Sequence, residues 1–134
     1  MIVPVSASYA VITALLMLAL AYRVSGFRLR DKIGLGDQGS HDLQIAVRSH
    51  ANLMEYAPLF LIMLFIGELN GIPVNWLNWV GALFVLSRFA HAWGMVAGSG
   101  GTHPGRFLGI AGTWLGFVAL AGMLLVNLMQ FRVL

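Results

Sequence analysis

Three polar side chains inside a long apolar stretch have the types and spacing that could bind a ligand. Arg48, Asn52 and Glu55 follow one another at intervals of four and three residues. On a helix they share one face and form a polar stripe about 10 Å long. Ionisable residues at membrane depth are costly and usually face a bundle interior or a water-filled cavity. A cation, an amide and an anion on one stripe predict a site for a small zwitterionic ligand.

A second polar face lies further along the chain. Arg88, His91 and Met95 are separated by three and four residues and therefore share one side of a helix. A histidine beside an arginine is often purely structural, but here two helices each offer an arginine on an inward stripe. Glu55 is the one acid inside the predicted spans apart from Asp42 and Glu68 at helix ends. The excess of positive charge predicts an anionic ligand that enters from the cytoplasmic side.

The composition is that of a membrane protein with a single domain, residues 1–134. Of the 134 residues, 59% are hydrophobic and 10% are charged, whereas soluble domains carry about 25% charged residues. The chain has no cysteine, which excludes disulfides, thiolate metal sites and a cysteine nucleophile, and we expect no metal. The net charge of +3 is small and local, so we expect no binding of nucleic acid.

Four membrane spans are predicted, at about residues 2–24, 42–70, 74–97 and 106–131, which makes the fold class an all-α bundle of four transmembrane helices. Residues 2–22 contain no charge and are long enough for one span. No Lys or Arg precedes this apolar run, which favours an anchor over a cleaved signal peptide. The second span should begin near Asp42, and it must include the polar stripe because its purely apolar part, 56–67, is too short to cross alone.

Basic residues predict the orientation. The first connector is assigned Arg23, Arg28, Arg30 and Lys32, and Arg106 adjoins the third connector. Because Lys and Arg favour cytoplasmic loops, the first and third connectors should be cytoplasmic and both termini should lie on the far side.

Each polar group also has a purely structural interpretation. Arg48 and Glu55 could pair with each other or with Arg88, and Asn52 could be an ordinary hydrogen bond between membrane helices. The basic residues of the first connector could serve as a topology signal or contact anionic lipids. Small residues on the fourth span are expected to be packing contacts rather than site residues, and these are Gly109, Gly112 and Gly116.

The motif around the first stripe resembles the signature of a known family. The run of Arg48, Asn52, Glu55, Tyr56 and Pro58, followed by Leu59 and Phe60, is similar to that of MAPEG, the membrane-associated proteins of eicosanoid and glutathione metabolism. The resemblance covers essentially the whole chain. The turn Gly36-Asp37-Gln38-Gly39 is similar to one in the small bacterial inner-membrane members, which implies an inner-membrane location.

The resemblance implies a homotrimer of four-helix subunits that binds glutathione, as a co-substrate, between neighbouring subunits near the cytoplasmic side. It also implies membrane lipids and a lipophilic small molecule as partners. The residues that match the family's glutathione-binding positions are Arg48, Asn52, Glu55 and Tyr56 on the second span, Arg88 and His91 on the third, and Arg28 from the adjacent subunit. Arg106 resembles the arginine that activates the thiol.

Two departures narrow the expected chemistry. Met95 stands where several members have a ligand-contacting tyrosine, and Phe107 follows Arg106 where prostaglandin E synthase-like members have a serine, so prostaglandin chemistry is not expected. The implied function is that of a glutathione transferase or peroxidase acting on lipophilic electrophiles or hydroperoxides. The alternative is a non-catalytic lipid-binding or scaffold protein of the same fold. A small transporter would also explain buried charges, but the spans are not interrupted at matching positions.

Overall fold

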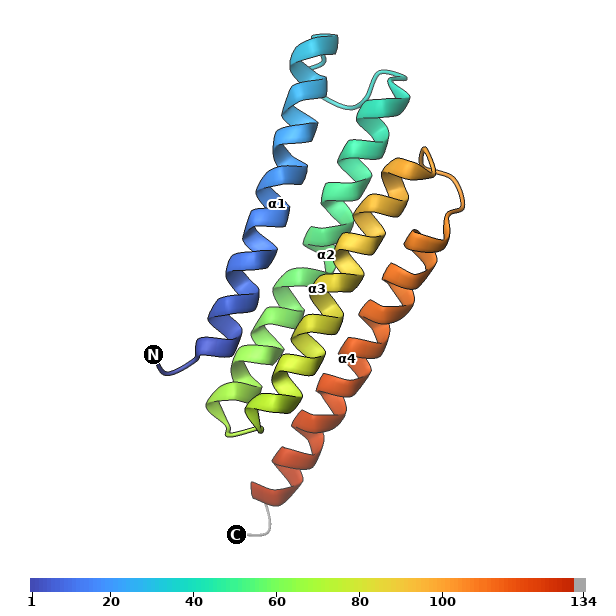
Figure 1. Cartoon of the computed structure of the whole chain (residues 1–134). Coiled ribbons are helices and arrows are strands. Elements are labelled where there is room, and N and C mark those ends of the chain that lie inside the picture. Colours follow the sequence, from blue (N-terminus) through green and yellow to red (C-terminus); the bar gives the residue numbers. More distant parts are fainter. Residues whose placement is uncertain (132–134) are drawn as a thin grey trace.

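The computed structural model describes residues 1–131, which form four α-helices joined by three connectors (Figure 1). The helices are α1 (Pro4–Asp31), α2 (His41–Leu69), α3 (Val74–Ala97) and α4 (Pro104–Phe131). All four are long and apolar enough to cross a membrane. The predicted all-α class is confirmed, and the architecture is that of a four-helix membrane bundle.

Three of the four predicted helices agree closely with the structure. α2 and α3 differ from the predicted ranges by at most one residue at either end. α4 begins two residues before the predicted start, at Pro104, because a proline lacks a backbone N–H and fits the first turn of a helix.

The prediction for the end of the first helix, at about residue 24, was wrong. α1 continues to Asp31 and ends where Lys32 adopts a left-handed conformation with φ 56°. Its last turns are stabilised by Arg23 and Arg30, whose guanidinium groups lie 5.5 and 4.7 Å from the centre of the Phe27 ring. Most of the basic residues assigned to the first connector therefore lie on α1 itself.

The connectors alternate between the two ends of the bundle. The first and third connectors lie together at one end, and the second connector and both chain termini lie at the other (Figure 1). This arrangement agrees with the predicted pairing of the connectors. Which side of the membrane each end faces remains a prediction from the basic residues.

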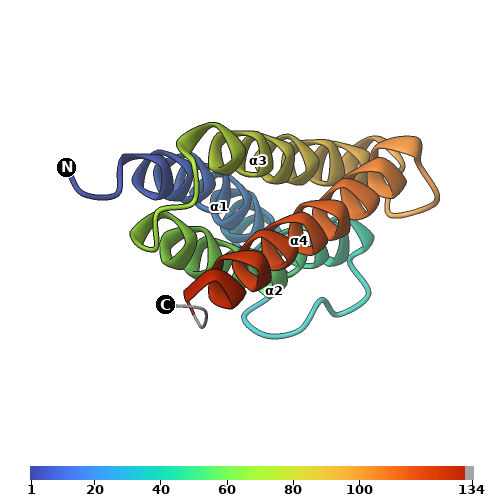
Figure 2. The ribbon, with the colours of Figure 1, turned by 90° about the horizontal axis from the view of Figure 1, so that it is seen from below.

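α3 contacts each of the other helices, and its contact with α4 is the most extensive. Within residues 1–131, α1 and α4 do not touch. Seen from below (Figure 2), α4 runs obliquely across the bundle, from α3 at its N-terminal end towards α2 at its C-terminal end. α4 thus packs mainly against α3 and less against α2.

Glycines allow α4 to approach α3 closely. A Cβ atom placed on Gly109 would lie 2.6 Å from the Cβ of His91 and 2.6 Å from the carbonyl oxygen of Ser87. A Cβ atom on Gly112 would overlap the hydroxyl of Ser87, whereas Gly116 has ordinary contacts with Phe60. The predicted packing role of these glycines is confirmed, and it places His91 and its neighbours directly beside α4.

Candidate functional site

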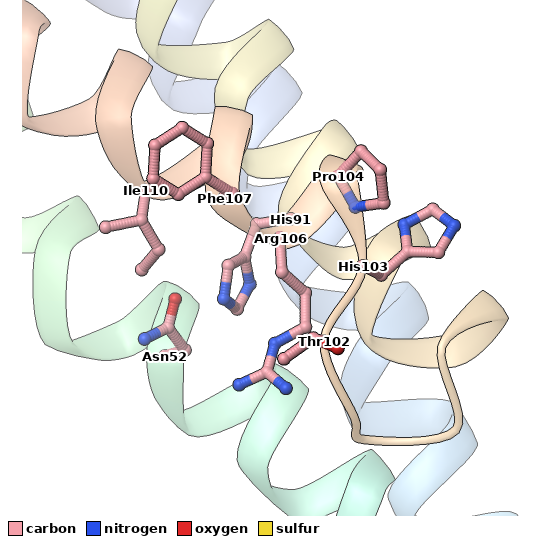
Figure 3. A pocket seen from close by; sticks show the side chains of 8 residues that line it. All are labelled: Asn52, His91, Thr102, His103, Pro104, Arg106, Phe107 and Ile110. Carbon is pink, nitrogen blue, oxygen red and sulfur yellow. The ribbon is translucent and has the colours of Figure 1, made fainter.

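A cavity of about 770 Å³ opens at the end of the bundle that carries the first and third connectors. It lies between α2, α3, α4 and the third connector (residues 98–103) (Figure 3). The residues that line it are Asn52, His91, Thr102, His103, Pro104, Arg106, Phe107 and Ile110.

Arg88 lies behind this cavity and is 2% exposed. Its Nη1 donates to Oδ1 of Asn52 at 2.8 Å, and its Nη2 donates to the carbonyl of Gly109 at 3.0 Å. The guanidinium also lies 5.3 Å from the centre of the Tyr56 ring. Each of these partners is electrically neutral, and Nε is buried with no hydrogen-bond partner among the described residues. A positive charge is therefore buried here without an acidic partner in the part of the chain that the structure describes.

Asn52 connects this buried charge to the cavity, because its side chain accepts from Arg88 and also forms part of the lining. His91 lies one turn after Arg88 on α3 and is 5% exposed. In Figure 3 its ring points towards Asn52. Within residues 1–131, no hydrogen bond reaches the ring nitrogens of His91, so they are available to a molecule in the cavity.

Arg106 comes from the first turn of α4 and is half-buried. Its Nη1 donates to the carbonyls of Gly100 and Gly101, at 2.5 and 2.6 Å. Figure 3 shows its guanidinium between α2 and the third connector. Nε and Nη2 make no hydrogen bond to the described residues, which leaves donors for an anion.

Arg48 and Glu55 lie outside the cavity. They pair with each other, with 3.7 Å between Arg48 Nη1 and Glu55 Oε1, and their side chains are 59% and 50% exposed in the single chain. Helix geometry explains why Asn52 lines the cavity and this pair does not. At about 100° per residue, Asn52 is offset by about 40° from Arg48 and by about 60° from Glu55 around the helix axis. Of the two structural alternatives, a pair with each other or with Arg88, the structure shows the pair between Arg48 and Glu55. The three residues of the stripe do not face one cavity within a subunit.

The two remaining predicted site residues have different surroundings. Tyr56 is half-buried against Arg88, and its hydroxyl lies 3.5 Å from the indole Nε1 of Trp114. Arg28 donates through Nη1 to the carbonyls of Ile33 and Gly36, at 3.3 and 3.2 Å, in the first connector. The structure thus brings together Asn52, Tyr56, Arg88, His91 and Arg106, and it leaves Arg28, Arg48 and Glu55 outside this group.

Sequence reasoning missed the contribution of the third connector. His103 lines the cavity, accepts a hydrogen bond at Nδ1 from the backbone N–H of Gly105 at 3.1 Å, and packs edge-on against Trp93 at 4.7 Å. A polar residue directly before a helix-starting proline is the signal that could have identified it, because such residues accept from the free N–H groups of the first turn.

Comparison with known proteins now identifies the family. The model of the MAPEG family matches residues 6–126. The chain belongs to the MAPEG family. It is 32% identical over 128 residues to inner membrane protein YecN of Escherichia coli strain K12, an alignment that covers 92% of this chain and 90% of that protein. The protein of the same name from Escherichia coli strain CFT073 gives the same values.

The match to MAPEG includes both polar stripes and every residue of the cavity. Membership suggests a membrane protein of glutathione or eicosanoid metabolism. Together with the four apolar helices, it makes this chain a multi-pass membrane protein, and the relative in Escherichia coli is named as an inner membrane protein.

Proposed function

We propose that this MAPEG protein binds glutathione in the cavity beside Arg88 and uses its thiolate to conjugate or reduce lipophilic electrophiles or hydroperoxides. The observation that carries the proposal is the buried guanidinium of Arg88, whose partners are all neutral. Arg106 adds a second cation to the cavity, and no acidic side chain is found among the described residues of the lining. Such a site favours a small anion.

Glutathione suits this arrangement because it carries two carboxylates, one ammonium group and a thiol. Arginine binds carboxylates through paired N–H donors. A cysteine-like thiol has a pKa near 8.5, and a neighbouring cation lowers it and so favours the nucleophilic thiolate. A decrease of about 2 pH units corresponds to about 2.7 kcal/mol, which one guanidinium in a partly dry cavity can supply. Arg106 is the proposed thiol-activating residue.

The apolar part of the cavity lining supports a lipophilic second substrate. Phe107 and Ile110 contribute apolar side chains to the lining, and Phe107 is 73% exposed on the outer face of α4. An apolar electrophile or hydroperoxide dissolved in the bilayer could reach the sulfur from this side without crossing water.

Assembly as a homotrimer is part of the proposal. Arg48 and Glu55 lie about 10 and 21 Å along α2 from its first residue, on an exposed face of a helix long enough to span the membrane. Charges on such a face are costly in contact with lipid. A neighbouring subunit would cover them and place them beside the ligand, with Glu55 facing the ammonium group, Arg48 a carboxylate, and Arg28 of the adjacent subunit a second contact.

The test is the addition of glutathione to purified protein in a mild detergent. A new thiolate absorbance band is expected, and S-methylglutathione, which has no free thiol, should bind without producing it. Binding of glutathione without the band would favour the non-catalytic alternative, and absence of binding would refute the proposal. The mass of the protein in the same detergent should be that of a trimer.

A further inference from the structure

The third connector holds Arg106 through its backbone. Both hydrogens of Arg106 Nη1 are directed to carbonyl oxygens, those of Gly100 and Gly101. Carbonyls are neutral acceptors, so they restrict the direction of the guanidinium without cancelling its charge. The position of Arg106 therefore depends on the position of two consecutive peptide groups.

The peptide group directly before these two is in turn attached to the start of α2. His41, the first residue of α2, has its Nε2 atom 3.0 Å from the carbonyl oxygen of Ser99. A carbonyl only accepts hydrogen bonds, so Nε2 must carry the proton. The contact is consequently possible in both the neutral and the protonated states of the ring.

The backbone of the connector is shaped for this attachment. Ser99 and Gly100 both have positive φ angles, of 46° and 77°, which turn consecutive carbonyls in different directions: Ser99 towards His41, Gly100 towards Arg106. A Cβ atom on Gly100 would lie 3.2 Å from Cγ1 of Ile45, so the turn also packs closely on α2. Left-handed angles favour glycine and are unfavourable for most other residues.

We infer that His41 is a positioning residue for Arg106, acting through the Ser99–Gly101 backbone. Its importance for catalysis rests on the proposed function, in which Arg106 faces the thiol. A displacement of about 1 Å at a reacting group can cost about a hundredfold in rate, and we expect about a tenfold loss of kcat when the attachment to α2 is removed. The affinity for glutathione should change little, because the contacts of Arg88 with Asn52 and Gly109 are separate from the connector.

The first test uses the protein without glutathione. His41→Phe keeps an aromatic ring but removes the donor, and His41→Gln restores an N–H donor. His50→Phe is the matched control, because His50 is a half-buried histidine of the same helix and makes no hydrogen bond within residues 1–131. In NMR spectra of protein with ¹⁵N-labelled arginine, the Arg106 guanidinium, assigned through Arg106→Lys, should show restricted rotation.

Hydrogen bonds to α3 also hold the connector, through the backbone N–H groups of Ser99 and Gly100. His41→Phe should therefore make this guanidinium rotate measurably faster than in the wild-type protein, and His50→Phe should not. Gly100→Ala should have the same effect as His41→Phe, because it opposes the left-handed turn. An unchanged Arg106 signal in both His41→Phe and Gly100→Ala would overturn the inference.

The second test measures turnover and glutathione affinity in the same variants. His41→Phe should reduce kcat with an unchanged Kd, and His41→Gln should recover most of the rate. A mobile guanidinium with unchanged kcat would refute the catalytic part of the inference. If the wild-type protein gives no thiolate band with glutathione, the proposed function fails, and the NMR comparison still decides whether His41 positions Arg106.

Discussion

Replacement of Asn52 measures how much its hydrogen bond to the buried guanidinium of Arg88 contributes to the free energy of unfolding. Asn52→Ala removes the acceptor 2.8 Å from Arg88 Nη1. Because Nε already has no partner among the described residues, two nitrogens of one buried guanidinium would then be unsatisfied. A hydrogen bond to a charged group contributes about 1.5–3 kcal/mol, so the unfolding equilibrium constant should rise about 10- to 150-fold.

Asn52→Asp separates stability from binding. It keeps an oxygen in the same place and adds a negative charge beside Arg88, so the folded state should retain the hydrogen bond and form an ion pair. The same charge would offset that of Arg88, and glutathione affinity should fall about tenfold or more through the lost attraction for its carboxylates.

The assays are reversible unfolding in mixed detergent micelles, followed by tryptophan fluorescence, and calorimetric titration with glutathione. Asn75→Ala, an exposed asparagine on α3, is the control and should change the free energy of unfolding by less than about 0.5 kcal/mol. An Asn52→Ala variant as stable as Asn75→Ala would refute the reasoning about Arg88, and an Asn52→Asp variant with undiminished affinity would remove the argument for an anionic ligand.

Four further perturbations test separate parts of the structure. Arg106→Ala should lower kcat about a hundredfold or more with little change in glutathione Kd and move the pH–rate profile towards alkaline pH; normal turnover at pH 7 would assign thiol activation elsewhere. Glu55→Gln should weaken glutathione binding about tenfold or more if Glu55 meets the ammonium group, and an unchanged Kd in the folded variant would contradict that role. Gly109→Ala should destabilise the fold by about 1–3 kcal/mol, whereas Gly122→Ala, where no atom lies within 4 Å of the added Cβ, should not. Glu68→Ala should cost about 0.5–2 kcal/mol, because its carboxylate accepts from the backbone N–H groups of Val5 and Ser6 at the start of α1; equal unfolding curves would show that these bonds contribute nothing.

The sequence alone was sufficient to predict the class, the number of helices and most of their ends. Apolar length and charge density depend on composition, which does not require knowledge of packing. The third helix was predicted with the bounds that the structure has, Val74–Ala97, because a proline-containing turn precedes it and a glycine-rich segment follows it. The end of the first helix was not predicted correctly. Its basic residues resemble a connector, but cation–π contacts with Phe27 stabilise the helical conformation there.

Locating the candidate site required both the sequence and the tertiary structure. Spacing along one helix correctly linked Arg48 with Glu55 and Arg88 with His91, since periodicity is a local property. Which of these groups faces the cavity is decided by the azimuth of each helix in the bundle, and a difference of about 40° turns Asn52 inward and leaves Arg48 outside. The contacts of Arg106 with the third connector, and of that connector with His41, join residues far apart in the chain. Only the tertiary structure could reveal them, because they depend on where helix ends meet in space and not on any pattern along the sequence.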